Sequence, residues 1–416
     1  MTSKKENNIQ EHLEREVKKQ LEIIKRGVLE IINEKELEDK IRRSLEQGRP
    51  LRIKLGIDPT APDIHLGFAV VLRKLKDFQG LGHQIVLIIG DFTAKIGDPS
   101  GRKKTRPQLT NEEIARNMKT YLEQISKILD VSKLEIRYNS EWLNSLTLAD
   151  IISLASQFTL QQILAREDFK NRIKAESPLH IHEILYPLCQ AYDSLKVKAD
   201  IEIGGMDQKF NCLLGRDLQK DVGEEPQTII LMPILTGPDR RKMSKSYGNY
   251  IGIAEPPQEM FNKIMSIPDD LMKEWFILCT DLSAEEIDRI LKEEHPMEDK
   301  KILAYEITKL YHGQEAAEKA KEEFERVFQQ RETPSEAILL EVTQEKLNLS
   351  LLDLLHDLGV VKSKSEGRRL LNAGAIEINN QIVSFEKQNK VSLKDGDIIR
   401  VGKKRFYRLK ISQRTI

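Results

Sequence analysis

The sequence predicts an α/β protein in which a parallel sheet is followed by a helical domain and a small α+β domain. Three observations lead to this fold class. A strand, a helix and a second strand follow one another between Leu51 and Asp91, and such a βαβ unit implies parallel strands joined by a right-handed crossover. The chain has 416 residues, which is too long for one ordinary domain. Residues 347–416 carry 14 basic and 7 acidic side chains although the whole chain is neutral, so this tail differs from the body.

The elements follow from periodicity and turn residues. Charged and apolar residues alternate at helical spacing over 7–45, which predicts one or two amphipathic helices. The first strand covers 51–57, the next helix reaches Gly82, and the second strand covers 84–91. The rest of the body is predicted, in order, as a loop over 97–104, a helix over 110–129, mixed helices to 179, a helix over 184–196, a strand over 199–204, a helix after 207, a strand over 227–235, a loop over 236–250 and a charged helical stretch over 256–331.

Composition excludes several classes of protein. No run approaches about 18 consecutive apolar residues, so no membrane span is expected. The first residues are polar and charged, without the apolar core of a signal peptide. Cys189, Cys212 and Cys279 are far apart and form no zinc pattern, which favours buried free thiols. We therefore expect a cytoplasmic protein without a tightly bound metal.

The first chemical motif lies where the first strand ends and a helix begins. It reads Asp58-Pro-Thr60-Ala-Pro-Asp-Ile-His65-Leu-Gly67-Phe68. Ligands of parallel sheets bind at the carboxyl ends of strands, and a helix N-terminus there attracts phosphate. Gly67 allows close approach to the backbone, and His65 can donate to a phosphate oxygen. A plain strand–helix turn with an incidental histidine is the alternative.

The second motif is Lys242-Met-Ser-Lys245-Ser246, in a loop about 180 residues later. Two flexible lysines beside small hydroxyl residues can wrap around a polyphosphate. A solvated basic loop is the alternative interpretation.

The third motif is a polar face on a helix. Tyr186, Gln190 and Asp193 are spaced four and three residues apart, so they share one side of the helix. Their neighbours are apolar, and polar groups in such surroundings need a partner, which favours a lined pocket over a polar surface stripe. Downstream, a strand ends in two glycines followed by Asp207 and Gln208.

Together the motifs resemble those of class I aminoacyl-tRNA synthetases. The first is similar to the family's His-Ile-Gly-His pattern, and the second matches Lys-Met-Ser-Lys-Ser throughout. The polar helix, the Gly-Gly-Met-Asp-Gln run and the Gly97-Asp98-Pro-Ser-Gly101 run resemble the tyrosyl enzymes, and residues 363–379 resemble an S4-type RNA-binding domain. The resemblance implies an N-terminal helical segment over 1–50, a Rossmann-like catalytic domain with a helical insertion over 51–250, a helical domain over 251–332, a linker over 333–346 and an S4-like domain over 347–416.

The resemblance also implies roles. The reaction would join tyrosine to ATP as tyrosyl-adenylate and pass the tyrosyl group to the 3′ end of tRNA(Tyr), with Mg²⁺ accompanying ATP and a homodimer as the working form. The residues that would act in catalysis are Thr60, His65, Lys242 and Lys245. ATP would contact His65, Gly67, Phe68, Arg102, Arg106, Lys245 and Ser246. Tyrosine would be held by Asp58, Asp98, Tyr186, Gln190, Asp193, Asp207 and Gln208, with Asp193 accepting the phenolic hydrogen. RNA would meet Lys362, Lys364, Arg368 and Arg369.

Two residues depart from the family pattern. Phe68 stands where the first signature has its second histidine, which removes one donor from the nucleotide side. Lys54 stands where many members carry a tyrosine near the phenol, and its ammonium could donate to the substrate hydroxyl instead.

Other functions remain open. They are a tryptophanyl enzyme, which Asp193 and the S4-like tail oppose, and a catalytically impaired RNA-binding relative, which only Phe68 supports. The GxGxxG expected of a nicotinamide-dependent oxidoreductase is absent after the first strand, and no GxxxxGK[ST] phosphate loop occurs.

Overall fold

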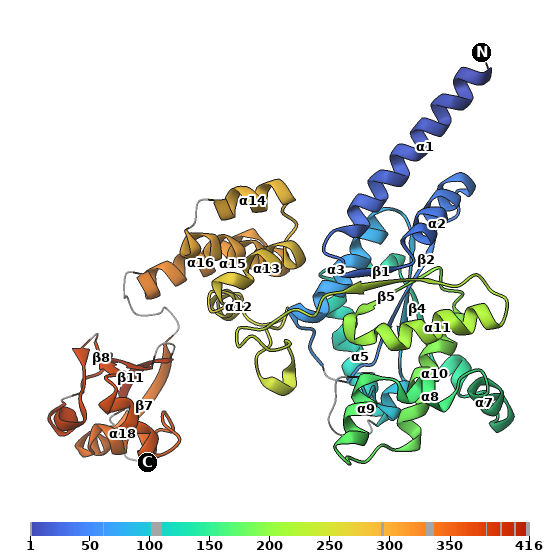
Figure 1. Cartoon of the computed structure of the whole chain (residues 1–416). Helices are drawn as coiled ribbons and strands as arrows, with labels where there is room; N and C mark the ends of the chain where they lie inside the picture. The colour runs from blue at the N-terminus through green and yellow to red at the C-terminus, as the bar shows by residue number, and fades with distance from the viewer. Residues whose placement is uncertain are drawn as a thin grey trace. The chain divides into compact units, whose positions relative to one another are not determined.

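The computed structural model describes residues 2–60, 62–100, 110–292, 295–329, 337–379, 381–391, 393–402 and 405–412. The chain divides into two compact units, Met1–Gln314 and Glu315–Ile416 (Figure 1). In the described part, no helix is long and apolar enough to cross a membrane.

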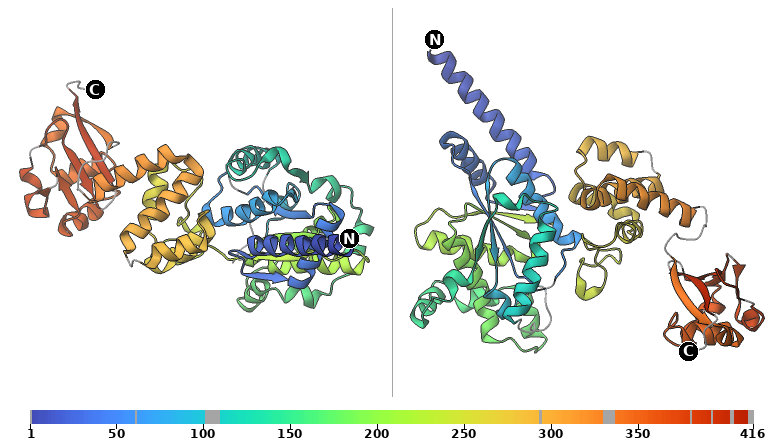
Figure 2. Two further views of the ribbon diagram at one scale, coloured as in Figure 1. Left: turned by 90° about the horizontal axis from the view of Figure 1, so that it is seen from above. Right: turned by 180° about the vertical axis from the view of Figure 1, so that it is seen from behind.

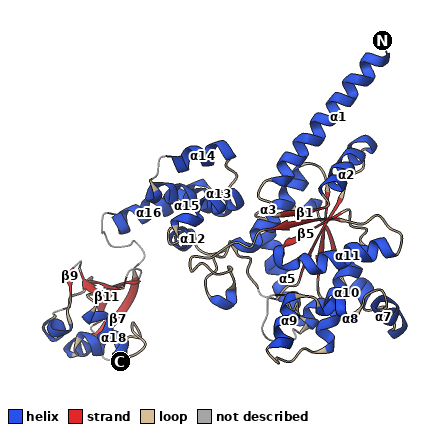
Figure 3. Cartoon of the chain, viewed as in Figure 1, coloured by secondary structure: helices blue, strands red, loops and turns tan. Residues whose placement is uncertain are grey.

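The first unit is built on a six-stranded sheet with helices around it (Figure 3). Its strands lie in the order β1-β6-β5-β2-β3-β4, and all neighbours are parallel except β1, which pairs antiparallel with β6. The strands are β1 (Glu30–Ile32), β2 (Arg52–Ile57), β3 (Gln84–Ile89), β4 (Glu135–Tyr138), β5 (Ile201–Gly205) and β6 (Thr228–Met232). The predicted α/β class with a parallel sheet is confirmed.

The order in which strands are added to this sheet changes direction beside β2. From β2 it proceeds outward to β3 and β4, and it later returns to place β5 on the other side of β2. The crevice at the carboxyl ends of two such strands is the usual ligand site of an open α/β sheet. The core strands are nearly continuous apolar runs, as in Gln84-Ile-Val-Leu-Ile-Ile89, because helices cover both faces.

Eleven helices of the first unit precede β6. They are α1 (Thr2–Lys25), α2 (Glu34–Gln47), α3 (Leu66–Gly80), α4 (Thr93–Ile96), α5 (Asn111–Ile125), α6 (Ser140–Leu143), α7 (Leu148–Ala155), α8 (Leu160–Leu164), α9 (Glu167–Lys174), α10 (Ile181–Lys196) and α11 (Lys209–Asp221), counted among the described residues. The far end of α1 projects away from the sheet (Figure 2). Its other end is anchored in the core by buried Val17 and Ile24.

A helical stretch follows the sheet. It contains α12 (Pro257–Ile264), α13 (Met272–Cys279), α14 (Ala284–Lys292), α15 (Pro296–His312) and α16 (Gln314–Phe324), which agrees with the helical pattern expected from 256 onward. The second unit holds a sheet in the order β7-β11-β10-β8-β9. Its elements are β7 (Ile338–Thr343), α17 (Leu351–Asp357), α18 (Lys364–Asn372), β8 (Ile376–Ile378), β9 (Gln381–Ile382), β10 (Ile398–Val401) and β11 (Arg405–Ser412).

Three short strands differ from the sequence prediction. β1 interrupts the helical stretch 7–45, and β4 lies within the part predicted as mixed helices. The predicted linker 333–346 contains β7, which pairs in parallel with β11, so its described part belongs to the second unit's sheet. Each is an edge strand of three to six residues. Such strands carry too little pattern of their own and are fixed by the strand they pair with.

A buried ion pair joins α9 to α10. Arg172 donates to both carboxylate oxygens of Glu183, and the side chains are 3% and 2% exposed. Glu183 also accepts the backbone N–H of His180 at the start of α10. The ion pair therefore fixes the first turn of α10, the helix whose polar face is predicted to line the pocket.

Replacing Arg172 by methionine is expected to lower the free energy of unfolding by about 3–5 kcal/mol, because it leaves the Glu183 carboxylate buried without a cation. Urea unfolding of the full chain measures this loss. The double variant Arg172→Met/Glu183→Leu is the matched control and should recover most of the stability. A single variant as stable as the wild type would contradict the assignment.

Candidate active site

Asp58 stands at the carboxyl end of β2, at the point where the sheet reverses. Its Oδ2 accepts the Tyr186 hydroxyl at 2.9 Å, and its Oδ1 accepts the Thr93 hydroxyl at 2.7 Å. Gly90, at the end of neighbouring β3, leaves room for this carboxylate, because a Cβ there would lie 1.9 Å from Oδ1. The structure thus brings together two of the predicted tyrosine-binding residues, from β2 and α10.

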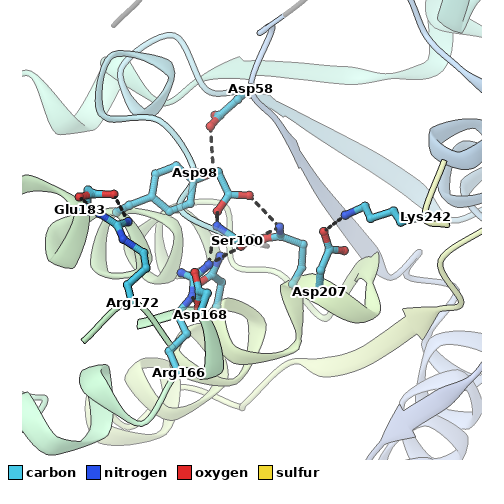
Figure 4. A network of polar contacts seen from close by, with 12 residues as sticks. Asp58, Asp98, Ser100, Arg166, Asp168, Arg172, Glu183, Asp207 and Lys242 are labelled. Atoms are coloured by element: carbon cyan, nitrogen blue, oxygen red, sulfur yellow. Dashed lines mark hydrogen bonds and ion pairs between the residues drawn. The ribbon is translucent and has the colours of Figure 1, made fainter. Parts of the chain in front are cut away.

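Asp98 lies in the turn that follows α4. Its Oδ1 accepts the backbone N–H of Ser100 at 2.9 Å, and its Oδ2 accepts the Gln208 amide at 2.9 Å. Gln208 follows β5, so residues predicted from separate motifs meet here. Figure 4 shows Asp98, Ser100 and Arg166 turned toward one another.

Arg166 completes this group and was not singled out from the sequence. Its guanidinium is 5% exposed, lies 2.7 Å from Asp168 and 3.6 Å from Asp98, and also donates to the Ser100 hydroxyl. Burial raises the pKa of Asp168, although Arg166 opposes the shift. Arg166 lies in a stretch predicted only as mixed helices, 68 residues beyond Asp98. The sequence carried no signal for this pairing.

Asp193 forms the buried end of the polar face on α10. Its side chain accepts the Trp142 indole N–H at 2.8 Å and the Asn139 amide at 3.3 Å. Burial raises the pKa of Asp193 to about 7, although the Lys54 ammonium and the two N–H donors lower it. The Asp193 carboxyl group is therefore buried, and two N–H donors fix its position.

Lys54 does not face the substrate as the sequence had suggested. Its side chain is fully buried, and its ammonium donates to Glu202 at 2.8 Å, to the Ser194 hydroxyl at 2.6 Å and to the Gln190 carbonyl at 3.1 Å. An ammonium has three N–H groups, and these three oxygens use all of them. The expectation that Lys54 donates to a substrate hydroxyl is corrected, because the fold supplies protein acceptors instead.

His65 is the N-cap of α3. Its Nδ1 accepts the backbone N–H of Phe68 at 3.2 Å, which leaves Nε2 to carry the proton. Burial, together with the nearby charges of Lys245 and Lys242, lowers the pKa of His65 to about 4. At neutral pH this imidazole is uncharged and offers one N–H beside a helix N-terminus.

The loop with the second motif lies against the first motif. The Met243 sulfur accepts the Gly67 N–H at 3.4 Å, and the Met243 side chain is 2% exposed. Lys242 pairs with Asp207 at 2.7 Å, an ion pair drawn in Figure 4, and Lys245 approaches Asp63 at 3.5 Å. Burial lowers the pKa of Lys245. The structure thus joins two motifs that lie about 180 residues apart in the sequence.

The structure describes some of the other residues that are predicted to act on or contact the nucleotide. Thr60 follows Asp58 and Pro59 after the end of β2, and its N–H donates to the Asp58 carbonyl at 2.7 Å. Phe68 is half-buried in the first turn of α3. Arg102 and Arg106 lie outside the described residues, as does the side chain of Ser246.

The basic residues predicted for RNA lie at α18 in the second unit. Lys362, Lys364, Arg368 and Arg369 are all exposed. Ser363 caps this helix by accepting the Glu366 N–H at 3.2 Å, and Lys364 pairs with Asp353 at 2.7 Å. They form one basic stretch on a small folded unit.

Comparisons with known proteins agree with this geometry. Residues 46–329 match the family described as tRNA synthetases class I (W and Y). The chain is 51% identical to the tyrosine–tRNA ligase of Aquifex aeolicus over 94% of its own length and 98% of the relative's. It is 52% identical to that of Carboxydothermus hydrogenoformans over 95% and 98%. The tyrosyl-tRNA synthetase of Archaeoglobus fulgidus, solved with L-tyrosine, superposes with a TM-score of 0.60 at 25% identity, covering 73% of this chain and 99% of that one. A truncated mitochondrial tyrosyl-tRNA synthetase of Aspergillus nidulans shares the fold, with a TM-score of 0.62 at 23% identity over 78% and 100%.

Proposed function

The chain belongs to the class I tRNA synthetases of the tryptophan and tyrosine group, and on that premise we propose that it activates L-tyrosine with ATP and transfers the tyrosyl group to tRNA(Tyr). The observation that supports this proposal is that the three sequence motifs contact one another in the structure. The phosphate-type loops around His65 and Lys242 lie against each other, and the polar face of α10 contacts Asp58, the first residue of the first motif, through Tyr186.

The activation step needs little covalent help from the protein. The tyrosine carboxylate attacks the α-phosphorus of ATP, a new P–O bond forms, and pyrophosphate leaves with the electrons of the broken bond. Positioning and charge stabilisation supply the rate in such phosphoryl-type transfers. His65 presents a neutral N–H and Thr60 a hydroxyl, while Lys242 and Lys245 exchange their carboxylate partners for the phosphates. Arg102 and Arg106 are proposed to reach the leaving pyrophosphate, and Gly67, Phe68 and Ser246 to border the nucleotide.

Tyrosine would lie between Asp58 and Asp193. The carboxylates of Asp58 and Asp98, with Tyr186 and Gln190, suit an ammonium group. Asp193 lies deeper and suits a phenolic hydrogen, whereas Asp207 and Gln208 would line the tyrosine and ribose region. A phenol acceptor of this kind favours tyrosine over tryptophan, whose indole N–H would have to reach the same carboxylate.

Magnesium is proposed to enter with ATP, held mostly by phosphate oxygens and water. Among the described residues, no group of three or more His, Cys, Asp or Glu side chains is arranged to hold a metal ion by itself.

The second unit is proposed to bind tRNA through the basic residues at α18. Lys and Arg on a compact domain fit the phosphates of folded RNA. The acyl group of tyrosyl-adenylate then passes to the terminal adenosine. The bacterial relatives are named tyrosine–tRNA ligases, and we propose that this chain acts in the cytoplasm.

A homodimer is supported by apolar side chains that the fold leaves exposed. Leu148 and Ile152 on α7 are 74% and 62% exposed, and Leu160 on α8 is 57% exposed. No residue of α7 is buried although the helix is mostly apolar. Such a cluster of exposed apolar side chains indicates an interaction surface, and we propose that a second copy of the chain binds there.

Replacing Ile152 by aspartate is expected to raise the dimer dissociation constant roughly 30-fold or more, because a buried anchor is worth about 2 kcal/mol or more. Sedimentation velocity over a concentration series measures it. Ile9→Asp on α1 is the matched control, since Ile9 is 70% exposed but lies elsewhere. Equal behaviour of both variants would remove α7 from the interface.

The experiment that tests the function is exchange of labelled pyrophosphate into ATP, with tyrosine, phenylalanine and tryptophan compared. Exchange with tyrosine alone supports the proposal and shows that Phe68 is tolerated. Exchange with tryptophan would keep the family and overturn the pocket assignment. No exchange from folded protein would favour the RNA-binding alternative.

A further inference from the structure

The fully buried Lys54 contacts the helix that carries the predicted pocket face, because its ammonium donates to the backbone carbonyl of Gln190 on α10. It pairs with Glu202 of β5, which is also almost fully buried. The sequence suggested for Lys54 only a direct contact with the substrate hydroxyl, which the structure corrects, and it assigned no role to Glu202. A buried ion pair is weak evidence for stability, so its presence beside a ligand pocket calls for another explanation.

Both carboxylate oxygens of Glu202 accept hydrogen bonds from protein donors. Its Oε1 accepts from Lys54 at 2.8 Å and from the Gln190 amide nitrogen at 3.2 Å. Its Oε2 accepts from the Ser194 hydroxyl at 3.1 Å and from the Gln227 amide. Burial by itself raises the pKa of Glu202, but the Lys54 charge and these donors hold the pKa below its usual value, so the carboxylate stays ionised.

An ionised carboxylate only accepts hydrogen bonds, which dictates how Gln190 is turned. The amide must direct its NH2 group to Glu202, and its oxygen then points away. In the described part of the chain, that oxygen has no hydrogen-bond partner. An ammonium group only donates, so the free oxygen is the half of the amide that can receive it.

We propose that Lys54 is a positioning residue that keeps the Gln190 amide oxygen directed at the tyrosine ammonium by holding Glu202 as an acceptor. This rests on the proposed function, because it takes tyrosine as the ligand. Lys54 also bonds the Gln190 carbonyl and Ser194, so the same ammonium ties α10 to β2 and β5. Without the lysine charge, Glu202 would bind a proton and could donate, and the Gln190 amide would be free to reverse.

The test compares three ligands by equilibrium binding to the full chain. L-Tyrosine and tyramine carry the ammonium, whereas 3-(4-hydroxyphenyl)propionic acid keeps the phenol and carboxylate but lacks it. Lys54→Met is expected to weaken tyrosine and tyramine about tenfold, the loss of one charge-assisted hydrogen bond, and to change the third ligand by less than about twofold.

Two further variants keep the test decisive. Glu202→Gln preserves shape but can both donate and accept, so it should give the same ammonium-specific pattern if Lys54→Met does not fold. Lys40→Met is the matched control, since Lys40 is also buried but its ammonium donates to the carbonyls of Asp200 and Pro226, away from α10. It should leave all three affinities unchanged.

Equal weakening of all three ligands in Lys54→Met and Glu202→Gln, or no weakening in either, would overturn the positioning role. Failure of the wild-type chain to bind tyrosine would instead count against the proposed function. The two failures are therefore distinguishable.

Discussion

Lys245→Ala is expected to lower the rate of tyrosine-dependent pyrophosphate exchange by ~10²–10³-fold. In other enzymes, removing one hydrogen-bond donor that stabilises the negative charge of the transition state lowers the rate by a similar factor. The remaining groups cannot replace that donor in a site that excludes water. Lys245 is half-buried, its pKa is lowered by burial, and its ammonium makes a loose ion pair of 3.5 Å with Asp63. Its ammonium is thus available for the phosphates once ATP arrives. Initial rates at saturating tyrosine, with ATP varied, measure the loss.

Lys263→Ala is the control for that variant. Both lysines lie over the Tyr250 ring, at 5.8 Å and 5.7 Å from its centroid, but Lys263 is engaged by Glu255 and Glu259. Its loss is expected to change the exchange rate no more than about threefold. If the two variants lost equal activity, the effect of Lys245 would be structural support of the loop and not charge on the phosphates.

Asp193→Asn is expected to reduce the preference for tyrosine over phenylalanine by roughly 10- to 100-fold in kcat/KM. A site that bonds a hydroxyl rejects the analogue lacking it by ~10⁴–10⁵, a magnitude established for tyrosyl-tRNA synthetases themselves. The amide can still accept, but it loses the charge assistance that makes such a hydrogen bond worth about 1.5–3 kcal/mol. Trp142 and Asn139 each donate to one oxygen of Asp193, so the asparagine oxygen can keep one of these two hydrogen bonds, and that bond should hold the side chain in the pocket. Exchange assays with each amino acid give the ratio.

Asp200→Asn serves as the matched acid-to-amide control. Asp200 accepts the Arg52 N–H at 2.8 Å at the opposite, amino-terminal end of the strands. Its replacement should leave the ratio unchanged. An unaltered ratio in Asp193→Asn would mean that another group selects the hydroxyl.

The motif residues could be found from the sequence because each lies within, or directly beside, a helix or strand with a clear sequence pattern. Asp58, His65, Gln208 and the α10 face all sit at strand ends or at helical spacing, and the structure brings them to one edge of the sheet. Asp98 was found by its turn and by family resemblance. The short edge strands β1, β4 and β7 were missed, since their pairing partners are far away in the sequence.

The buried supports of the site could not be predicted. Arg166 reached Asp98 and Ser100 from a helix-rich stretch with no recognisable motif, and Lys54 proved to face Glu202 and not the ligand. A lysine in a strand gives no sign of which acceptor it meets, because the choice depends on the carboxylates of neighbouring strands and helices. The sequence by itself determined the α/β class, the two phosphate-type loops and the polar face of α10, since these arise from local periodicity and fixed spacing. Only the tertiary structure decided which charges are paired and buried, because in a low-dielectric interior a charge must find its partner through space and not along the chain.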